Sequence, residues 1–261
     1  MRLTVVGSSG SFPGPGNPAS CYLVEADGFR VLLDLGSGAL GELARQVSPD
    51  DVDAVLLSHL HPDHCLDLCG LYVARKYRPE GPRLPRLPVH GPAGTAERMA
   101  RAYGPSEKGL SEKGLTEELD FVDWQPTQRI GPFLVTVARV EHPVEAYGIR
   151  LEHDGAVLTY SGDTDSCDAL VDLARDADVF LCEASFLEGR DEGRGVHLTG
   201  LRAGRAAADA GARRLLLTHL PPWTPGDAVL AEAARTYAGP TALARPGDVV
   251  EVGGALDRVA P

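Results

Sequence analysis

Three histidines and an aspartate fall within six positions of this chain, in the segment His59-Leu60-His61-Pro62-Asp63-His64. The segment follows the apolar run 54–57, which predicts a short β-strand. Imidazole and carboxylate groups are the usual ligands of zinc, and the end of a strand supports them rigidly. His59 and His61 are alternate residues, so they point the same way from an extended segment. The following turn can bring Asp63 and His64 to a second metal, so the spacing predicts a dinuclear metal site at a sheet edge.

Three more candidate ligands follow predicted strands. His142 comes after the strand 133–140, Asp163 after 157–161, and His219 after 214–218. A single histidine at a strand end is more often structural than a metal ligand. Together with the first cluster, however, these residues predict that several strand ends converge on one edge of the fold.

The rest of the pattern consists of short strands followed by alternating strands and helices. Further strands are predicted at Leu3–Gly7, Ser20–Ala26, Phe29–Asp34, Leu87–His90, Tyr147–His153 and Val179–Glu183. Helices are predicted at Gly38–Gln46, Asp67–Tyr77, Ala93–Tyr103, Cys167–Ala174, Thr199–Ala210 and Pro225–Tyr237. Asp27-Gly28 and Asp154-Gly155 predict tight hairpins. The tandem repeat within 104–118 predicts a surface insertion, and no boundary divides the chain, so residues 1–261 are expected to form one domain.

Composition excludes several classes of protein. A net charge of −12 disfavours nucleic-acid binding through a broad basic surface, so tRNA is not an expected partner. The absence of a long apolar run and of a signal-peptide pattern predicts a cytoplasmic protein without membrane spans. Five cysteines without CxxC spacing favour reduced thiols and argue against a structural zinc site built from cysteine.

The order His-x-His-x-Asp-His, a distant His, Gly162-Asp163-Thr164 and a final His resembles the metallo-β-lactamase superfamily. The resemblance runs from the Gly7–Ser11 loop to His219, nearly the whole chain. It implies an α/β fold, a four-layer αβ/βα sandwich with a dinuclear site at its edge. It also implies two zinc ions, one held by His59, His61 and His142, the other by Asp63, His64 and His219, with Asp163 bridging them. Manganese or iron would accept the same ligands.

Two further elements narrow the resemblance within the superfamily. The segments 182–186 and 197–199 are similar to elements of ribonuclease Z-type enzymes and of small phosphodiesterases. In those enzymes a histidine at the His197 position assists chemistry at phosphorus. His142 and Asp163 are only 21 positions apart, which leaves no room for the long arm that grips tRNA in bacterial ribonuclease Z. The whole chain resembles actinobacterial cyclic nucleotide phosphodiesterases, which implies a compact phosphodiester substrate such as 3′,5′-cyclic AMP.

The resemblance also implies catalytic roles. Asp63 is expected to bind a metal and orient the attacking water, and His197 to stabilise the phosphoryl oxygens or protonate the leaving oxygen. Glu183 is expected to orient His197 or a metal-binding histidine, although a carboxylate at a strand end can equally cap nearby amides. Dimers are common among such enzymes, so a homodimer is a further expectation.

Other functions remain open on the sequence alone. An arm-less ribonuclease or a 2′,3′-cyclic phosphodiesterase would use the same site, as would a thioester or lactone hydrolase. A non-enzymatic scaffold would be expected to have lost ligands, whereas all seven positions are filled here. A diiron redox protein is disfavoured because that branch replaces His61 with glutamate.

Overall fold

A computed structural model describes residues 1–79, 84–104 and 115–253 of the protein. Apart from its last residue, the tandem repeat predicted to mark a surface insertion lies outside these ranges. Within them, two seven-stranded mixed sheets carry the fold, with strand orders β14-β1-β2-β3-β4-β5-β6 and β13-β12-β11-β10-β9-β8-β7. The first sheet contains β1 (Arg2–Gly7), β2 (Cys21–Ala26), β3 (Phe29–Leu33), β4 (Ala54–Leu56), β5 (Leu87–Gly91), β6 (Leu119–Asp123) and β14 (Val249–Glu251). The second contains β7 (Thr127–Ile130), β8 (Phe133–Arg139), β9 (Tyr147–His153), β10 (Ala156–Tyr160), β11 (Val179–Glu183), β12 (Leu215–Thr218) and β13 (Thr241–Leu243).

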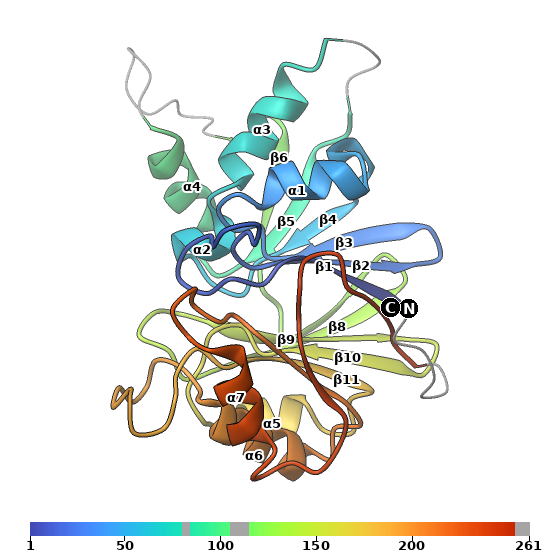
Figure 1. Ribbon diagram of the computed structural model, residues 1–261. Coiled ribbons are helices and arrows are strands. Elements are labelled where there is room, and N and C mark those ends of the chain that lie inside the picture. The colour runs from blue at the N-terminus through green and yellow to red at the C-terminus, as the bar shows by residue number, and fades with distance from the viewer. Residues whose placement is uncertain (80–83, 105–114, 254–261) are drawn as a thin grey trace.

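Helices cover the outer face of each sheet (Figure 1). The first sheet carries α1 (Ala39–Gln46), α2 (Pro62–Cys65), α3 (Leu68–Lys76) and α4 (Thr95–Tyr103), with the 3₁₀ turn η1 (Pro49–Asp51) beside them. The second sheet carries α5 (Asp168–Leu173), α6 (Gly200–Ala210) and α7 (Gly226–Ala233). Three buried apolar clusters fill the spaces between helices and sheet, between the two sheets, and between sheet and helices again. The molecule is therefore a four-layer αβ/βα sandwich, which confirms the predicted fold class.

Strand direction explains why the candidate ligands meet. The strands β3 to β6 run parallel, and so do β10 to β13. The strands β1 and β8 share these directions because two antiparallel pairings separate each from its parallel neighbours. The carboxyl ends of all these strands consequently open at one edge of the sandwich, the edge at which open α/β sheets usually bind ligands.

Both predicted hairpins are present. Asp27 and Gly28 join β2 to β3 with φ angles of 51° and 78°, and Asp154 and Gly155 join β9 to β10 with 48° and 78°. Two consecutive positive φ angles are typical of the type I′ turn, whose twist matches that of the paired strands.

The strands that sequence analysis missed are β6, β7, β13 and β14, which are the four outer edges of the two sheets. Edge strands are short and often polar, so they lack a continuous apolar run. The last helix is shorter than predicted, because α7 ends at Ala233 rather than at Tyr237. The amides of Arg235 and Thr236 bond carbonyls three residues back, which tightens the chain into a turn. No helix in the described ranges is long and apolar enough to cross a membrane.

Candidate metal centre

The first group of candidate ligands contains His59, His61, His142 and Asp163, whose nearest nitrogen and oxygen atoms all lie within 4.8 Å of one another. His59 Nε2 lies 3.0 Å from His61 Nδ1, and His142 Nε2 lies 3.2 Å from the same atom. Ligand nitrogens about 2.0–2.1 Å from a tetrahedral zinc ion are roughly 3.3 Å apart. The three ring nitrogens therefore have nearly the spacing that one bound metal requires.

The second group contains Asp63, His64, His219 and again Asp163. His64 Nε2 and His219 Nε2 are 3.1 Å apart, and Asp63 Oδ2 lies 3.1 Å from His219 Nε2. Asp163 Oδ2 is 3.6 Å from His59 Nε2, while its Oδ1 is 3.1 Å from His64 Nε2. Each oxygen of Asp163 thus faces a different group, as a bridging carboxylate would.

The chemistry of these atoms fits a pair of cations. Asp163 Oδ1 is buried and has no hydrogen bond of acceptable geometry, although a buried carboxylate oxygen normally has one. Burial would raise the pKa of Asp163, but the imidazoles of His219 and His64 hold it well below its usual range. Burial also lowers the pKa values of His59 and His142, which favours neutral imidazole. Ionised carboxylate and neutral imidazole are the forms that bind metal.

The outer nitrogen of four of the histidines is held by the protein. Nδ1 of His64 lies 2.7 Å from Asp34 Oδ2, and Nδ1 of His219 lies 2.9 Å from Ser185 Oγ. Nδ1 of His142 lies 2.8 Å from the carbonyl oxygen of Val196, and Nδ1 of His59 lies 3.1 Å from Ser58 Oγ. These contacts direct Nε2 of each ring inward, whereas His61 presents Nδ1. Such outer partners orient metal ligands.

Asp34 is a buried carboxylate beside a candidate ligand, and sequence analysis did not single it out. It is fully buried just after β3, with a positive φ of 59°. Besides His64, its carboxylate accepts hydrogen bonds of 2.7 Å from the amide and hydroxyl of Ser58 and from the hydroxyl of Tyr160. The only available signal was an aspartate ending an apolar strand, and this signal does not distinguish a ligand-orienting carboxylate from an ordinary turn residue.

His197 and Glu183 lie beside both groups. Glu183 ends β11, is fully buried, and its Oε1 accepts a 2.8 Å hydrogen bond from Nδ1 of His197. The His197 ring centroid is 5.6 Å from that of His142 and 5.5 Å from that of His219. Burial would lower the pKa of His197, but the Glu183 carboxylate outweighs this effect and raises it to about 9. Glu183 thus favours the protonated form of an imidazole that lies next to both candidate metal positions.

Comparison with known proteins identifies the family. Residues 29–220 match the family model described as the β-lactamase superfamily domain. The chain belongs to the metallo-β-lactamase superfamily. Within this superfamily it is 45% identical over 255 residues to an uncharacterized protein of Mycobacterium leprae, covering 97% of this chain and 89% of the relative.

Two relatives that are named for an enzymatic activity are also similar. The probable metallo-hydrolase YhfI of Bacillus subtilis is 32% identical over 257 residues, covering 96% of this chain and all of the relative. Its crystal structure superposes with a TM-score of 0.84 at 31% identity, covering 96% of this chain and 99% of that one. The ribonuclease Z of Myxococcus xanthus is 28% identical over 309 residues, covering 97% and 98% of the two chains. This superfamily member is accordingly a metallo-hydrolase.

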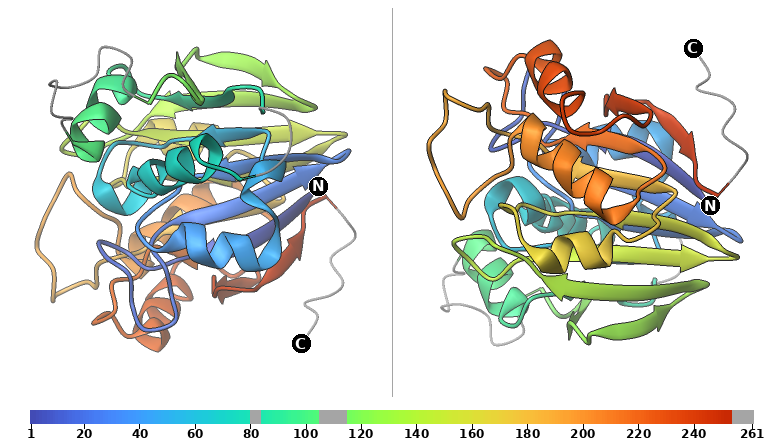
Figure 2. Two further views of the ribbon diagram at one scale, coloured as in Figure 1. Left: turned by 90° about the horizontal axis from the view of Figure 1, so that it is seen from above. Right: turned by 90° about the horizontal axis from the view of Figure 1, so that it is seen from below.

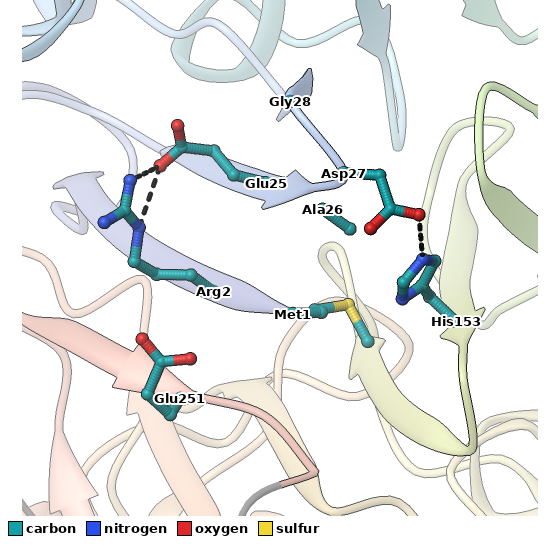
Figure 3. A pocket seen from close by; sticks show the side chains of 8 residues that line it. All are labelled: Met1, Arg2, Glu25, Ala26, Asp27, Gly28, His153 and Glu251. Atoms are coloured by element: carbon teal, nitrogen blue, oxygen red, sulfur yellow. Dashed lines mark hydrogen bonds and ion pairs between the residues drawn. The ribbon is translucent and has the colours of Figure 1, made fainter.

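A separate hollow lies at the other end of β1, where Arg2 and Met1 face the β2–β3 turn (Figure 3). Its volume is about 410 Å³, and four of its polar lining residues form two pairs: Arg2 with Glu25 at 2.6 Å, and His153 with Asp27 at 2.9 Å. None of the lining residues belongs to a candidate metal group among the described residues. The candidate metal groups of this superfamily member are therefore separate from the hollow.

Proposed function

We propose that the protein is a dinuclear-metal phosphodiesterase that hydrolyses cyclic nucleotides such as 3′,5′-cyclic AMP to the 5′-monophosphate. The observation that carries the proposal is the position of His197. Its ring lies 5.6 and 5.5 Å from the rings of two candidate ligands, one in each metal group, and the buried Glu183 holds its Nδ1. A protonated imidazole at this point suits a reaction in which charge develops on phosphoryl oxygens and a leaving alkoxide departs.

The proposed roles of the residues follow from their contacts. One zinc ion would be held by His59, His61 and His142, a second by Asp63, His64 and His219, with Asp163 shared between the two. When bound, two such metals supply a water of lowered pKa and stabilise negative charge on the phosphate.

The remaining chemistry falls to side chains of the protein. Asp63 would orient the attacking water through its carboxylate. Nε2 of His197 would donate its proton towards the leaving oxygen, because Nδ1 is occupied by Glu183 at 2.8 Å. Glu183 would act as a positioning residue, since its four hydrogen bonds anchor it to the surrounding backbone and to His197.

A compact substrate is supported by the chain between His142 and Asp163. These residues are joined by β9 and β10, which form a tight hairpin without an extended arm. The similarity to ribonuclease Z keeps an arm-less ribonuclease as the second candidate, with a 2′,3′-cyclic phosphodiesterase beside it. The net charge of −12 favours a small substrate over a folded RNA. A thioester or lactone hydrolase has weaker support, because the segments 182–186 and 197–199 resemble elements of phosphodiesterases.

The decisive experiment is to incubate the zinc-loaded protein with 3′,5′-cyclic AMP and follow AMP formation by chromatography. His61→Ala serves as the control for the metal site, and His197→Ala as the control for proton donation. AMP formation that is lost in both variants supports the proposal. If a protein shown to hold two metals leaves 3′,5′-cyclic AMP intact but cleaves 2′,3′-cyclic AMP or RNA ends, the second candidates replace it.

A further inference from the structure

Two exposed aromatic side chains meet beside the candidate metal centre. Phe12 is 41% exposed and Trp223 is 60% exposed. Their ring centroids are 5.1 Å apart and their planes are inclined by 41°. We refer to Phe12 and Trp223 as the aromatic pair. Large aromatic side chains left open to solvent in this way are a common feature of binding surfaces.

The loop that carries Phe12 packs directly on a candidate metal ligand. The amide of Gly10 donates a 3.1 Å hydrogen bond to the carbonyl of Leu220, and Ser9 forms a β-bridge with the same residue. A Cβ atom at Gly10 would lie 2.3 Å from the carbonyl oxygen of His219 and 3.1 Å from its Nδ1. Only glycine allows this close approach, so the position of Phe12 is coupled to that of His219.

Trp223 lies just after the His219–Leu220 segment, against which the loop that carries Phe12 packs. It follows His219 by four residues, in a turn closed by a 2.8 Å hydrogen bond from the amide of Thr224 to the carbonyl of Pro221. The hydroxyl of Thr224 donates to the carbonyl of Ser185, whose own hydroxyl contacts Nδ1 of His219. One short chain of contacts therefore links Trp223 to the metal ligand.

Prolines restrict the backbone of both loops. The first contains prolines at 13, 15 and 18, and the second at 221, 222 and 225. The hydroxyl of Ser9 donates a 2.7 Å hydrogen bond to the carbonyl of Phe12, and Gly14 packs so closely that a Cβ there would lie 3.2 Å from Pro222 Cγ. Figure 2 shows the first loop, in dark blue, projecting from the same edge of the sandwich as the orange segment that carries His197. Fixed loops reduce the entropy lost when a ligand is bound.

We infer that the aromatic pair binds the nucleobase of the substrate by stacking, while the phosphate lies at the candidate metal centre. This inference rests on the proposed function and names its specificity surface. A nucleobase is planar with two apolar faces, which suits exposed aromatic rings. The strongly negative net charge disfavours binding a nucleotide through a basic groove, so base stacking is the stronger source of affinity outside the metal centre.

Binding can be measured without turnover. AMP is titrated into the zinc-loaded protein while tryptophan fluorescence is recorded, with ribose 5-phosphate as the matched ligand that lacks a base. We expect AMP to quench the fluorescence of the unmodified protein, ribose 5-phosphate to have little effect, and Trp223→Phe to lose most of the quenching. Equal quenching by both ligands, or quenching that persists in Trp223→Phe, would overturn the inference.

Kinetics provide the second test. Phe12→Ala and Trp223→Ala should each raise KM for 3′,5′-cyclic AMP by about 5- to 100-fold with kcat nearly unchanged, whereas Trp223→Phe should retain most of the affinity. The matched control is Tyr77→Ala, because Tyr77 is 65% exposed and caps the end of α3 away from these loops. Unchanged KM in both alanine variants, in a protein that hydrolyses cyclic AMP, would refute the aromatic pair and leave the proposed function standing.

A different combination of results would support the base-binding inference and contradict the proposed function. If AMP quenches Trp223 but no cyclic nucleotide is hydrolysed, the base-binding surface stands and the proposed reaction fails.

Sedimentation velocity tests whether the aromatic pair instead contacts a second copy of the chain. A dimer that Trp223→Ala converts to monomer with unchanged KM would identify the aromatic pair as a contact between copies and overturn the inference.

Discussion

Nδ1 of His197 donates a 2.8 Å hydrogen bond to Oε1 of Glu183, a carboxylate that is fully buried and accepts three backbone amides besides. Two donors point at each of its oxygens. Glutamine at this position would therefore direct its NH₂ group against two donors whichever way it turned, and it would remove the charge that raises the pKa of His197.

We expect Glu183→Gln to lower kcat by about 10²–10⁴-fold, the usual value of a positioned proton donor, while the zinc content stays at that of the unmodified protein. The double variant with His197→Ala should be no slower than His197→Ala alone, because the two residues act as a unit. Multiplicative losses measured by steady-state kinetics would contradict a positioning role for Glu183.

Asp34 should control metal affinity without touching the metal. Asp34→Asn removes the charged partner of His64 Nδ1, which lies 2.7 Å away, and we expect zinc affinity to fall by about 10- to 100-fold. Competition with a chromogenic chelator measures the change. Asp178→Asn is the matched control, since Asp178 pairs with Val157 and Arg213. Equal affinity in Asp34→Asn and the control would contradict this role.

Metal stoichiometry should follow the division into two groups. His61 belongs to the first group, whereas Asp163 belongs to the first and the second. We expect His61→Ala to retain about one zinc per chain and Asp163→Ala to retain less, because a bridging carboxylate serves both ions. Elemental analysis after gel filtration gives the counts. Identical zinc content in the two variants would rule out Asp163 as the shared ligand.

Zinc should also stabilise the folded chain, because the seven candidate ligands come from four separate parts of the sequence, 59–64, 142, 163 and 219, and these parts meet only after folding. At free zinc 100- to 1,000-fold above Kd, each occupied site should raise the free energy of unfolding by about 3–4 kcal/mol. Thermal unfolding with and without chelator tests this. A melting temperature independent of zinc in the unmodified protein would argue that the site does not bind it.

Low pH should remove one specific contribution to the stability of the folded protein. This contribution comes from the end of β1 that lies away from the candidate metal centre. Glu25 accepts from Arg2 and Arg30, at 2.6 Å and 3.0 Å (Figure 3 shows the first pair). Burial opposes the effect, but the two guanidinium groups lower the pKa of Glu25 below its usual 4.5. A depressed folded-state pKa means that this stabilisation is present at neutral pH and is lost as pH falls through that pKa.

Glu25→Gln should therefore destabilise the protein at pH 7 by no more than about 1 kcal/mol, because the arginines are partly exposed. This difference should shrink as the pH falls from 7 to 3, towards and through the lowered pKa of Glu25. Denaturant unfolding of the metal-free protein isolates this effect from metal loss. A difference between variant and unmodified protein that is the same at both pH values would contradict the electrostatic explanation.

The residue pattern indicated the seven candidate ligands, whereas the role of His197 and the four-layer fold were implied by the resemblance to the metallo-β-lactamase superfamily. The signal was strong because metal ligands cluster at short spacing after apolar strands, and because central strands must be continuously apolar to be buried on both faces. The segment His59 to His64 satisfies the first condition, and the apolar runs around β10 to β12 satisfy the second. The local sequence pattern was therefore sufficient for these parts of the chain. The edge strands β6, β7, β13 and β14 satisfy neither, since one side of each has no partner and its sequence can be polar.

Only the tertiary structure decided which groups meet. Asp34 and His64 are 30 residues apart, and Ser185 and His219 are 34 apart, yet each pair is joined by a hydrogen bond that orients a candidate ligand. Phe12 and Trp223 come from opposite ends of the chain and touch because Gly10 packs on His219. Ligand chemistry is a property of residue type and spacing, so sequence determines it. The partners that orient ligands are set by how two sheets stack, and no local pattern encodes that contact.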